Sequence, residues 1–144
     1  MKLLTIIIFL AYSNAAYSWS TPQEALNEFL KFELNCGRCQ SWPFNKYLAV
    51  DKNYDEPGWD MIDLVDNYKV VSLTCKKTSC KASVHFSLSP TRNVPKAQVV
   101  SNPNGGHLIA NYTVIKHSGQ WLLTGSGDGY PMVYFSTYKK LFSK

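Results

Sequence analysis

The chain has 144 residues and carries 15 Lys and Arg against 10 Asp and Glu, a formal net charge of +5 at pH 7. Its basic residues are scattered in small groups around residues 76–81 and at the C-terminus. They do not form the basic stripe with interleaved aromatic residues that nucleic-acid binding requires, so we exclude a nucleic-acid partner. The length suits one domain with a single hydrophobic core.

The first fifteen residues have the pattern of a secretory signal. Lys2 gives a positive start, residues 3–12 are apolar, and Ser13-Asn14-Ala15 places small residues at a cleavage site. This apolar segment is about half as long as the roughly 20 residues that cross a bilayer. We therefore expect a signal peptide at 1–15 and a single domain at 16–144. The domain is expected to be periplasmic or extracellular, with no membrane attachment after cleavage.

A helix is predicted to begin at Thr21. Thr21 can cap it, Pro22 suits the first helical position, and Glu24 can complete a capping box. Apolar residues follow at helical spacing, at Ala25, Leu26, Phe29, Leu30, Phe32 and Leu34. Gly37 is expected to end the helix.

The segment 40–58 is irregular and rich in aromatic residues. Trp42, Tyr47 and Tyr54 in this segment, and Trp59 directly after it, cannot all be buried easily, and Tyr and Trp are favoured anchors at protein interfaces. We predict these four as binding residues. The alternative is that they fill the open end of a sheet as part of the core.

Asp60 is the carboxylate that we consider first for an acid/base role. It follows Trp59 at a turn, and an apolar neighbour can raise the pKa of a carboxyl group toward working pH. The alternative is that Asp60 caps a short helix, because residues 59–66 are expected to form one or two helical turns. We favour capping over catalysis.

Residues 68–74 and 81–88 are predicted to form a β-hairpin around the turn at 76–79. Setting Cys75 opposite Cys80 places Leu73 opposite Ala82. The same register makes one face apolar, with Val71, Leu73, Cys75, Cys80, Ala82, Val84 and Phe86, and pairs Val71 with Val84. The other face is polar, with Ser72, Thr74, Lys81, Ser83, His85 and Ser87, and Val70 is its apolar exception.

This register also decides the cysteine pairing that we favour. Opposed strand residues have about the Cα separation of a disulfide, so Cys75–Cys80 is predicted and Cys36–Cys39 follows by elimination. A crossed pairing, such as Cys36 with Cys75, would close a larger loop and contribute more stability, so energy alone does not exclude it. The Cys-x-x-Cys spacing also raises thiol-redox or zinc chemistry. However, the first pair follows a helix C-terminus, and the gap between pairs exceeds zinc-ribbon spacing. We favour two structural disulfides, with no metal and no cofactor.

The C-terminal half predicts a strand at 97–100, a turn at 102–106, and a second hairpin. That hairpin joins 108–116 to 120–125 about Ser118-Gly119, with His117 opposite Gln120. Apolar spacing at 134–142 indicates a final helix. His107 and His117 flank one strand and are too far apart to share a metal.

The tripeptide Asn111-Tyr112-Thr113 is an N-glycosylation sequon, which has meaning only in a eukaryotic secretory pathway.

One amphipathic helix and several hairpins predict an α+β fold, with the N-terminal helix packed on a curved antiparallel sheet and a short C-terminal helix. Three segments carry a family resemblance: Thr21-Pro-Gln-Glu-Ala25, Glu56-Pro-Gly-Trp-Asp60 and Gly119-Gln-Trp121-Leu-Leu. With them the chain resembles the nuclear-transport-factor-2-like superfamily of cystatin-like rolls. The resemblance implies a pocket between sheet and helices, in a superfamily that includes small enzymes, binding domains and toxin-immunity domains. The fold therefore does not choose among functions.

The sequence shows no phosphate loop, zinc-binding histidine pair or nucleophile elbow. The leading hypothesis is an exported, non-catalytic domain that binds another protein, as an immunity or inhibitor partner would. Two alternatives stay open. One is a small pocket enzyme or ligand binder using Asp60 as acid or base, and the other is a thiol-redox protein using Cys36 and Cys39.

Overall fold

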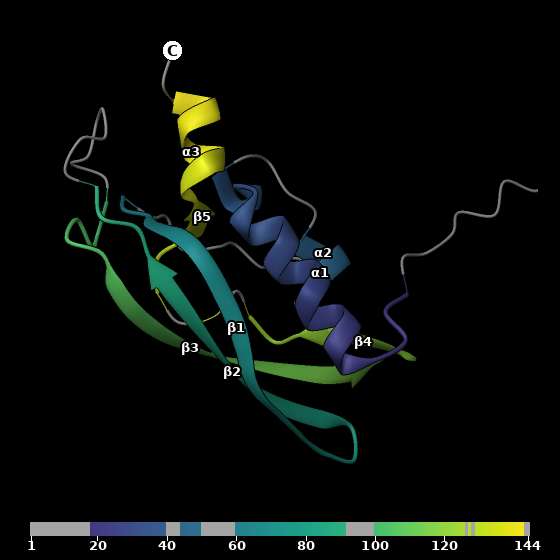
Figure 1. The fold of residues 1–144 in the computed structure, drawn as a ribbon. Coiled ribbons are helices and arrows are strands. Elements are labelled where there is room, and N and C mark those ends of the chain that lie inside the picture. Colours follow the sequence, from purple (N-terminus) through teal and green to yellow (C-terminus); the bar gives the residue numbers. More distant parts are fainter. Residues whose placement is uncertain are drawn as a thin grey trace, which may run out of the picture.

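A five-stranded sheet with the N-terminal helix packed across one face forms the protein (Figure 1). The computed structural model describes residues 18–39, 44–49, 60–91, 100–125, 127 and 129–142. The predicted signal peptide lies outside these residues. The elements in chain order are α1 (Pro22–Leu34), the 3₁₀ helix η1 (Gly37–Cys39), α2 (Phe44–Tyr47), β1 (Asp63–Lys76), β2 (Ser79–Leu88), β3 (Gly106–His117), β4 (Gln120–Leu123), β5 (Met132–Tyr134) and α3 (Phe135–Phe142).

The predicted α+β class is confirmed, but the sheet is mixed rather than antiparallel. Its order is β4-β3-β2-β1-β5, and β5 runs parallel to β1. After β4 the chain returns to the opposite edge of the sheet, where the N–H of Asp63 donates to the carbonyl of Pro131 at 2.9 Å. Three residues are too few to show an alternating pattern, which is why β5 was not predicted. The final helix was predicted and is confirmed as α3.

The helix α1 begins as predicted. The Thr21 side chain accepts a hydrogen bond from the N–H of Glu24 at 3.1 Å, and the Glu24 carboxylate accepts one from the N–H of Ser20 at 2.9 Å. The predicted Gly37 stop is wrong. The helix ends at Leu34, and Cys36 takes the left-handed conformation with a φ of 67°.

The first hairpin has the predicted cysteine register, with Cys75 opposite Cys80 and Leu73 opposite Ala82. The pairing of Val71 with Val84 is wrong. A β-bulge between Val70 and Ser72 makes Val71 an extra residue, and Val70 lies opposite Val84 instead. Val71 is half exposed, whereas Val70 packs against the core.

A second bulge lies between Val65 and Asn67. Between them the two bulges keep the apolar residues of β1 on one face although their spacing is uneven, at Val65, Tyr68, Val70, Leu73 and Cys75. Bulges increase the local bend of a strand, which fits the curled sheet in Figure 1.

The helical turns expected at 59–66 are wrong, because Asp63 already begins β1. Leu64 and Val65 are both buried but belong to different clusters of buried residues. Val65 lies in the main cluster with α1, and Leu64 lies in a second cluster with Tyr138 of α3 and Cys36. A strand buried on both faces has a continuous apolar run, which cannot be distinguished from a helix by periodicity.

The second hairpin is confirmed, since His117 pairs with Gln120. Ser118 and Gly119 form its turn with φ angles of 49° and 86°, the left-handed pair that a two-residue hairpin turn requires. Of the strand predicted at 97–100, only Val100 lies within the described residues, where it forms an isolated bridge with Ile62.

Candidate functional site

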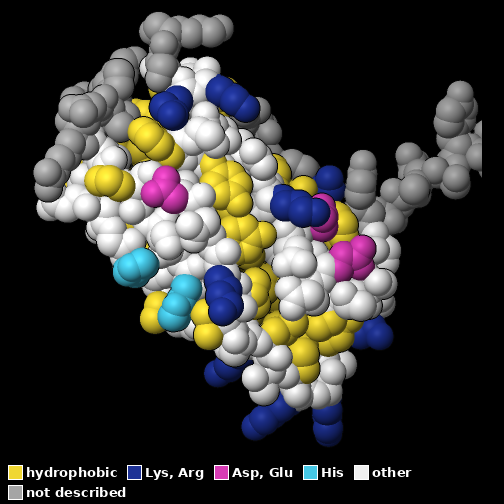
Figure 2. Space-filling view, in the orientation of Figure 1, with side chains coloured by type: hydrophobic (Ala, Val, Ile, Leu, Met, Phe, Trp, Pro, Cys, Tyr) yellow, Lys and Arg dark blue, Asp and Glu magenta, His cyan; other side chains and the backbone are white. Residues whose placement is uncertain are grey.

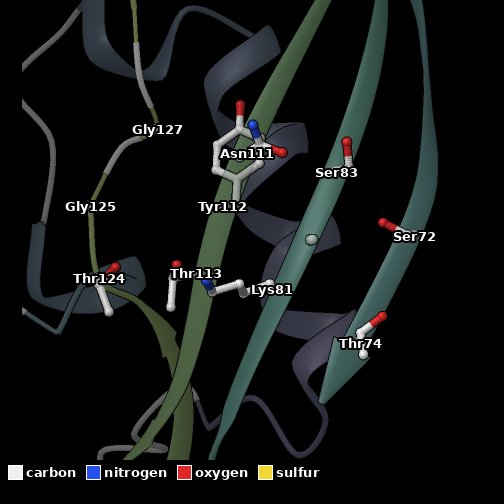
Figure 3. Close-up of a pocket in the computed structure, with 11 residues that line it drawn as sticks. Ser72, Thr74, Lys81, Ser83, Asn111, Tyr112, Thr113, Thr124, Gly125 and Gly127 are labelled. Carbon is white, nitrogen blue, oxygen red and sulfur yellow. The ribbon is translucent and has the colours of Figure 1, made fainter. Parts of the chain in front are cut away.

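A groove of about 630 Å³ lies on the face of the sheet that is turned away from α1 (Figure 3). Its lining comes from β1, β2 and β3 and from the segment that follows β4. The residues that line it are Ser72, Thr74, Lys81, Ala82, Ser83, Asn111, Tyr112, Thr113, Thr124, Gly125 and Gly127.

Strand register aligns the polar side chains of the groove in two rows. One row runs from Ser72 through Ser83 to Asn111, which are directly paired across three strands. Adjacent strands lie about 4.8 Å apart, so neighbouring side chains of a row are within reach of one ligand.

The second row runs from Thr74 through Lys81 to Thr113, and the chain after β4 extends it. There the N–H of Thr124 donates to the carbonyl of Thr113 at 3.0 Å. The two rows together give the groove a floor of hydroxyl and amide groups with one ammonium group.

The strands place these groups outward because the residues between them are needed in the core. Ala82, Val84, Tyr112 and Val114 alternate with the polar residues and are all buried. The ring of Tyr112 packs edge-on against Phe29 of α1, with centroids 5.9 Å apart. The polar face is thus fixed by the same alternation that builds the core.

One wall of the groove depends on a glycine. Gly127 has a φ of 89°, and a Cβ at this position would lie 2.6 Å from the Tyr112 ring. A larger residue would therefore be strained in its backbone and would also push against the ring. The close approach brings the segment after β4 to the edge of β3.

The groove can form many hydrogen bonds. No carboxylate, histidine or cysteine is among the described residues that line it. Hydroxyl and amide groups both donate and accept hydrogen bonds, and Lys81 adds three donors and a positive charge. This set of groups is suited to holding a polar or anionic surface.

Asp60, the candidate acid or base, lies outside the groove. It is exposed, in a bend before β1, and the described residues that follow it are extended rather than helical. The capping role that we favoured is therefore wrong, because the described residues after Asp60 form no helix that it could cap.

Of the four predicted binding residues, only Tyr47 lies within the described part of the chain. Its exposed fraction is 7%, and its ring stacks on Phe32 and Trp19 with centroid distances of 4.6 and 6.1 Å. Tyr47 thus belongs to the core, as the alternative interpretation stated. Trp42, Tyr54 and Trp59 lie outside the described residues.

All four cysteines are paired as predicted. The Cα atoms of Cys36 and Cys39 are 5.0 Å apart, and those of Cys75 and Cys80 are 4.0 Å apart. Neither pair lies in the groove lining, and no free cysteine remains. Within the described ranges, no group of three potential metal ligands occurs.

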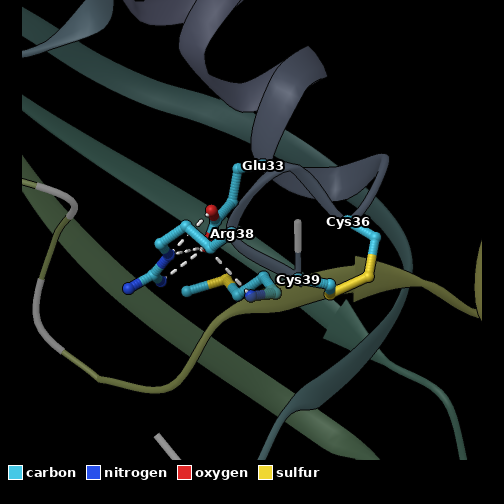
Figure 4. Close-up of polar contacts among 5 residues, drawn as sticks. Glu33, Cys36, Arg38 and Cys39 are labelled. Atoms are coloured by element: carbon cyan, nitrogen blue, oxygen red, sulfur yellow. Dashed lines mark hydrogen bonds and ion pairs between the residues drawn. A yellow bond between two sulfur atoms is a disulfide. The ribbon is translucent and has the colours of Figure 1, made fainter. Parts of the chain in front are cut away.

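Arg38, which lies between the first two cysteines, is engaged elsewhere. Figure 4 shows its guanidinium turned toward the carboxylate of Glu33 and away from the Cys36–Cys39 bond. Its Nε donates to both Glu33 oxygens, at 3.0 and 2.9 Å. Arg38 thus pairs with Glu33 instead of acting as a cationic partner for a thiolate.

The histidines lie outside the groove lining. His85 is exposed on the polar face of β2, as predicted, and His107 and His117 are exposed near opposite ends of β3. The sequon residues Asn111 and Thr113 both line the groove, so a glycan attached to Asn111 would occupy it.

The polar face of the first hairpin was predicted, but its role in a groove was missed. The residues that complete the groove lie on the second hairpin, at Asn111 and Thr113, and directly after it, at Thr124. The alternation of Asn111 and Thr113 with Tyr112 and Val114 was a usable signal. What the sequence alone did not supply was the register between β2 and β3.

Comparison with known protein families, curated proteins and solved structures finds no match to this chain. Within the described residues, the helices are too short or too polar to cross a membrane.

Proposed function

We propose that this protein is an exported, non-catalytic binding domain that recognises another protein, as an inhibitor or immunity protein would. The observation that carries the proposal is the groove, a continuous outer surface of hydrogen-bonding groups whose described lining holds no carboxylate or histidine. Acid/base catalysis usually depends on such a group, whereas recognition depends on complementary contacts.

Apolar side chains beside the groove support a protein partner. Val71 adjoins Ser72 in the β1 bulge and is 50% exposed, and Ile109 on β3 is 56% exposed. Protein interfaces combine apolar contacts with surrounding hydrogen bonds, and this surface offers both.

Two disulfides support the exported location, because such bonds persist in oxidising compartments and are rare in the cytosol. The predicted signal at 1–15 is consistent with this location. The assignment to the nuclear-transport-factor-2-like superfamily belongs to the same proposal. Its support is the long N-terminal helix packed on one face of a curled sheet.

The alternatives have less support from the described residues. Asp60 is exposed outside the groove, and Cys36 is fully buried and disulfide-bonded. An enzyme using Asp60 needs a carboxylate that is more enclosed. A redox protein using Cys36 needs a thiol that is more accessible.

The test is a partner search with a groove variant. The mature protein, its disulfides intact, is immobilised and exposed to exported proteins of its source. Ser83→Arg places a bulky side chain in the groove, and Gln23→Arg on the exposed side of α1 adds the same charge elsewhere.

We expect a partner that binds the wild-type protein and Gln23→Arg but not Ser83→Arg. Calorimetry with the purified partner should then give a defined stoichiometry. Recovery of no partner, or of one that Ser83→Arg binds equally well, would contradict the proposal.

A further inference from the structure

The two halves of the chain carry opposite charge. Residues 19–66 contain four Lys and Arg and nine Asp and Glu, whereas residues 67–144 contain ten Lys and Arg and one carboxylate, Asp128. From Asn67 onward, β1 has no Asp or Glu, and neither do β2, β3 and β4. Charge asymmetry of this kind points to a charged partner.

The fold concentrates part of this charge at one end of the sheet. Lys76 and Lys77 lie at the turn between β1 and β2, and Lys81 lies two residues into the groove side of β2. The pairing of β3 adds Lys116, whose N–H donates to the carbonyl of Thr78 at 2.8 Å. We call these four residues the lysine cluster. All four are exposed.

Among the described residues, no salt bridge involves the lysine cluster. The described salt bridges involve other residues, on or beside α1. Figure 2 shows dark blue side chains gathered at the lower end of the molecule, where Figure 1 places the β1–β2 turn, and no magenta side chain among them. Like charges placed together repel, so this end of the sheet favours a negatively charged surface.

We infer that the groove recognises a protein surface rich in carboxylates, with Lys81 inside the groove and Lys76, Lys77 and Lys116 at its end. This inference rests on the proposed function and specifies its partner. The lysine cluster adjoins the groove through Lys81, so that one partner can contact both. Complementary charge speeds association and excludes partners of like charge.

A protein fits this surface better than a nucleic acid or an acidic polysaccharide does. Binding of bases, and of the apolar faces of sugars, uses exposed aromatic rings, but the one ring among the described residues of the groove lining, that of Tyr112, is buried against Phe29. The exposed Val71 and Ile109 offer apolar contacts that a polypeptide can use.

The test uses poly-L-glutamate as the acidic polypeptide and alginate as a polysaccharide that also has one carboxylate per unit. Dissociation constants are measured at low ionic strength for the intact mature protein. The test variant carries Lys76→Gln, Lys77→Gln, Lys81→Gln and Lys116→Gln. The control variant carries Lys31→Gln, Lys46→Gln, Lys139→Gln and Lys140→Gln, which lower the net charge equally.

We expect poly-L-glutamate to bind the wild-type protein, and the test variant to lose affinity by about tenfold or more. The control variant should change by no more than about twofold. If both variants lose affinity for poly-L-glutamate equally, net charge alone explains the binding, and the inference is overturned. Absence of poly-L-glutamate binding, or cluster-dependent binding of alginate in preference to it, would overturn it as well. Circular dichroism confirms that each variant is folded.

The two proposals fail in different ways. If a groove-dependent partner is found and the test variant binds it as well as the wild type does, only the acidic nature of the partner is refuted. If poly-L-glutamate binding depends on the lysine cluster and no protein partner is recovered, the proposed function is refuted and the anion-binding property remains.

Discussion

The carboxylate of Glu33 and the guanidinium of Arg38 form a buried ion pair at the C-terminal end of α1. Arg38 Nη2 lies 2.5 Å from Glu33 Oε1, and the exposed fractions of the two residues are 9% for Arg38 and 2% for Glu33. The same oxygen accepts a hydrogen bond from the N–H of Met132 at 3.0 Å. One carboxylate thus ties α1, the Cys36–Cys39 segment and β5 together.

Glu33→Gln is expected to lower the free energy of unfolding by about 3–5 kcal/mol, because it leaves the Arg38 charge buried without its counter-ion. Urea unfolding followed by circular dichroism measures the change. Glu28→Gln is the matched control, since Glu28 lies on the outside of the same helix and pairs with the exposed Lys31. A loss no larger than that of the control would show that the pair is not buried in solution.

Adding Arg38→Met to Glu33→Gln is expected to recover part of that loss. The double variant also removes the buried charge that has lost the Glu33 carboxylate, while the amide oxygen introduced at position 33 still accepts a hydrogen bond from the N–H of Met132. Additive losses from the two changes, measured by the same unfolding experiment, would exclude coupling between these side chains.

Replacing Cys75 and Cys80 by Ala is expected to lower the free energy of unfolding by about 2 kcal/mol, because the loop that they close is short. Under reducing conditions, with all cysteines as thiols, wild type and variant should differ much less. Peptide mapping without reduction is expected to find Cys75 linked to Cys80 and Cys36 to Cys39. A peptide that joins the two pairs would contradict the structure.

The bulge in β1 makes opposite predictions for two neighbouring valines. Val70→Asp is expected to lower the free energy of unfolding by about 2–3 kcal/mol, because the charge would face the core opposite Val84. Val71→Asp should change it by no more than about 0.5 kcal/mol, since Val71 is half exposed. Each variant is the control for the other. If urea unfolding shows a larger loss of stability for Val71→Asp than for Val70→Asp, the register without the bulge is the correct one.

The parts of the fold that the sequence predicts are those set by neighbouring residues. Thr21, Pro22 and Glu24 define the start of α1 locally. Cys75 and Cys80 fix their hairpin because a turn of four residues allows few registers. At Val71 the same reasoning failed, since strict alternation cannot reveal an extra residue whose effect is to keep Val70 facing the core.

The parts that depend on distant segments were missed. At the start of β1, distant segments supply the backbone partners: the N–H of Asp63 donates to the carbonyl of Pro131, and the carbonyl of Ile62 accepts from the N–H of Ser101. The groove has a similar origin. Ser83 and Asn111 are 28 positions apart in the chain, and only the pairing of β2 with β3 places them side by side. Polar residues that each looked solvated on their own strand thus form one surface.

Tyr138 gives a prediction for alkaline pH. Burial raises the pKa of Tyr138 above its ordinary value, and the ring packs in the cluster beneath α3 with Cys36 and Val133. The unfolded chain loses this phenol proton near pH 10, whereas the folded chain retains it to higher pH. The stability that Tyr138 contributes is therefore complete below about pH 10 and is lost as the pH rises through the folded pKa.

Tyr138→Phe is expected to flatten the decline of stability above about pH 10, because phenylalanine has no proton to lose. Urea midpoints measured at half-unit pH intervals test this expectation. Tyr130→Phe serves as the control, because Tyr130 is 43% exposed and its replacement should leave the alkaline decline as steep as in the wild type. If both variants decline as the wild type does, then the ring of Tyr138 reaches water in the folded protein. Its place beneath α3 would then be wrong, since a phenol in contact with solvent ionises at nearly the same pH in both states.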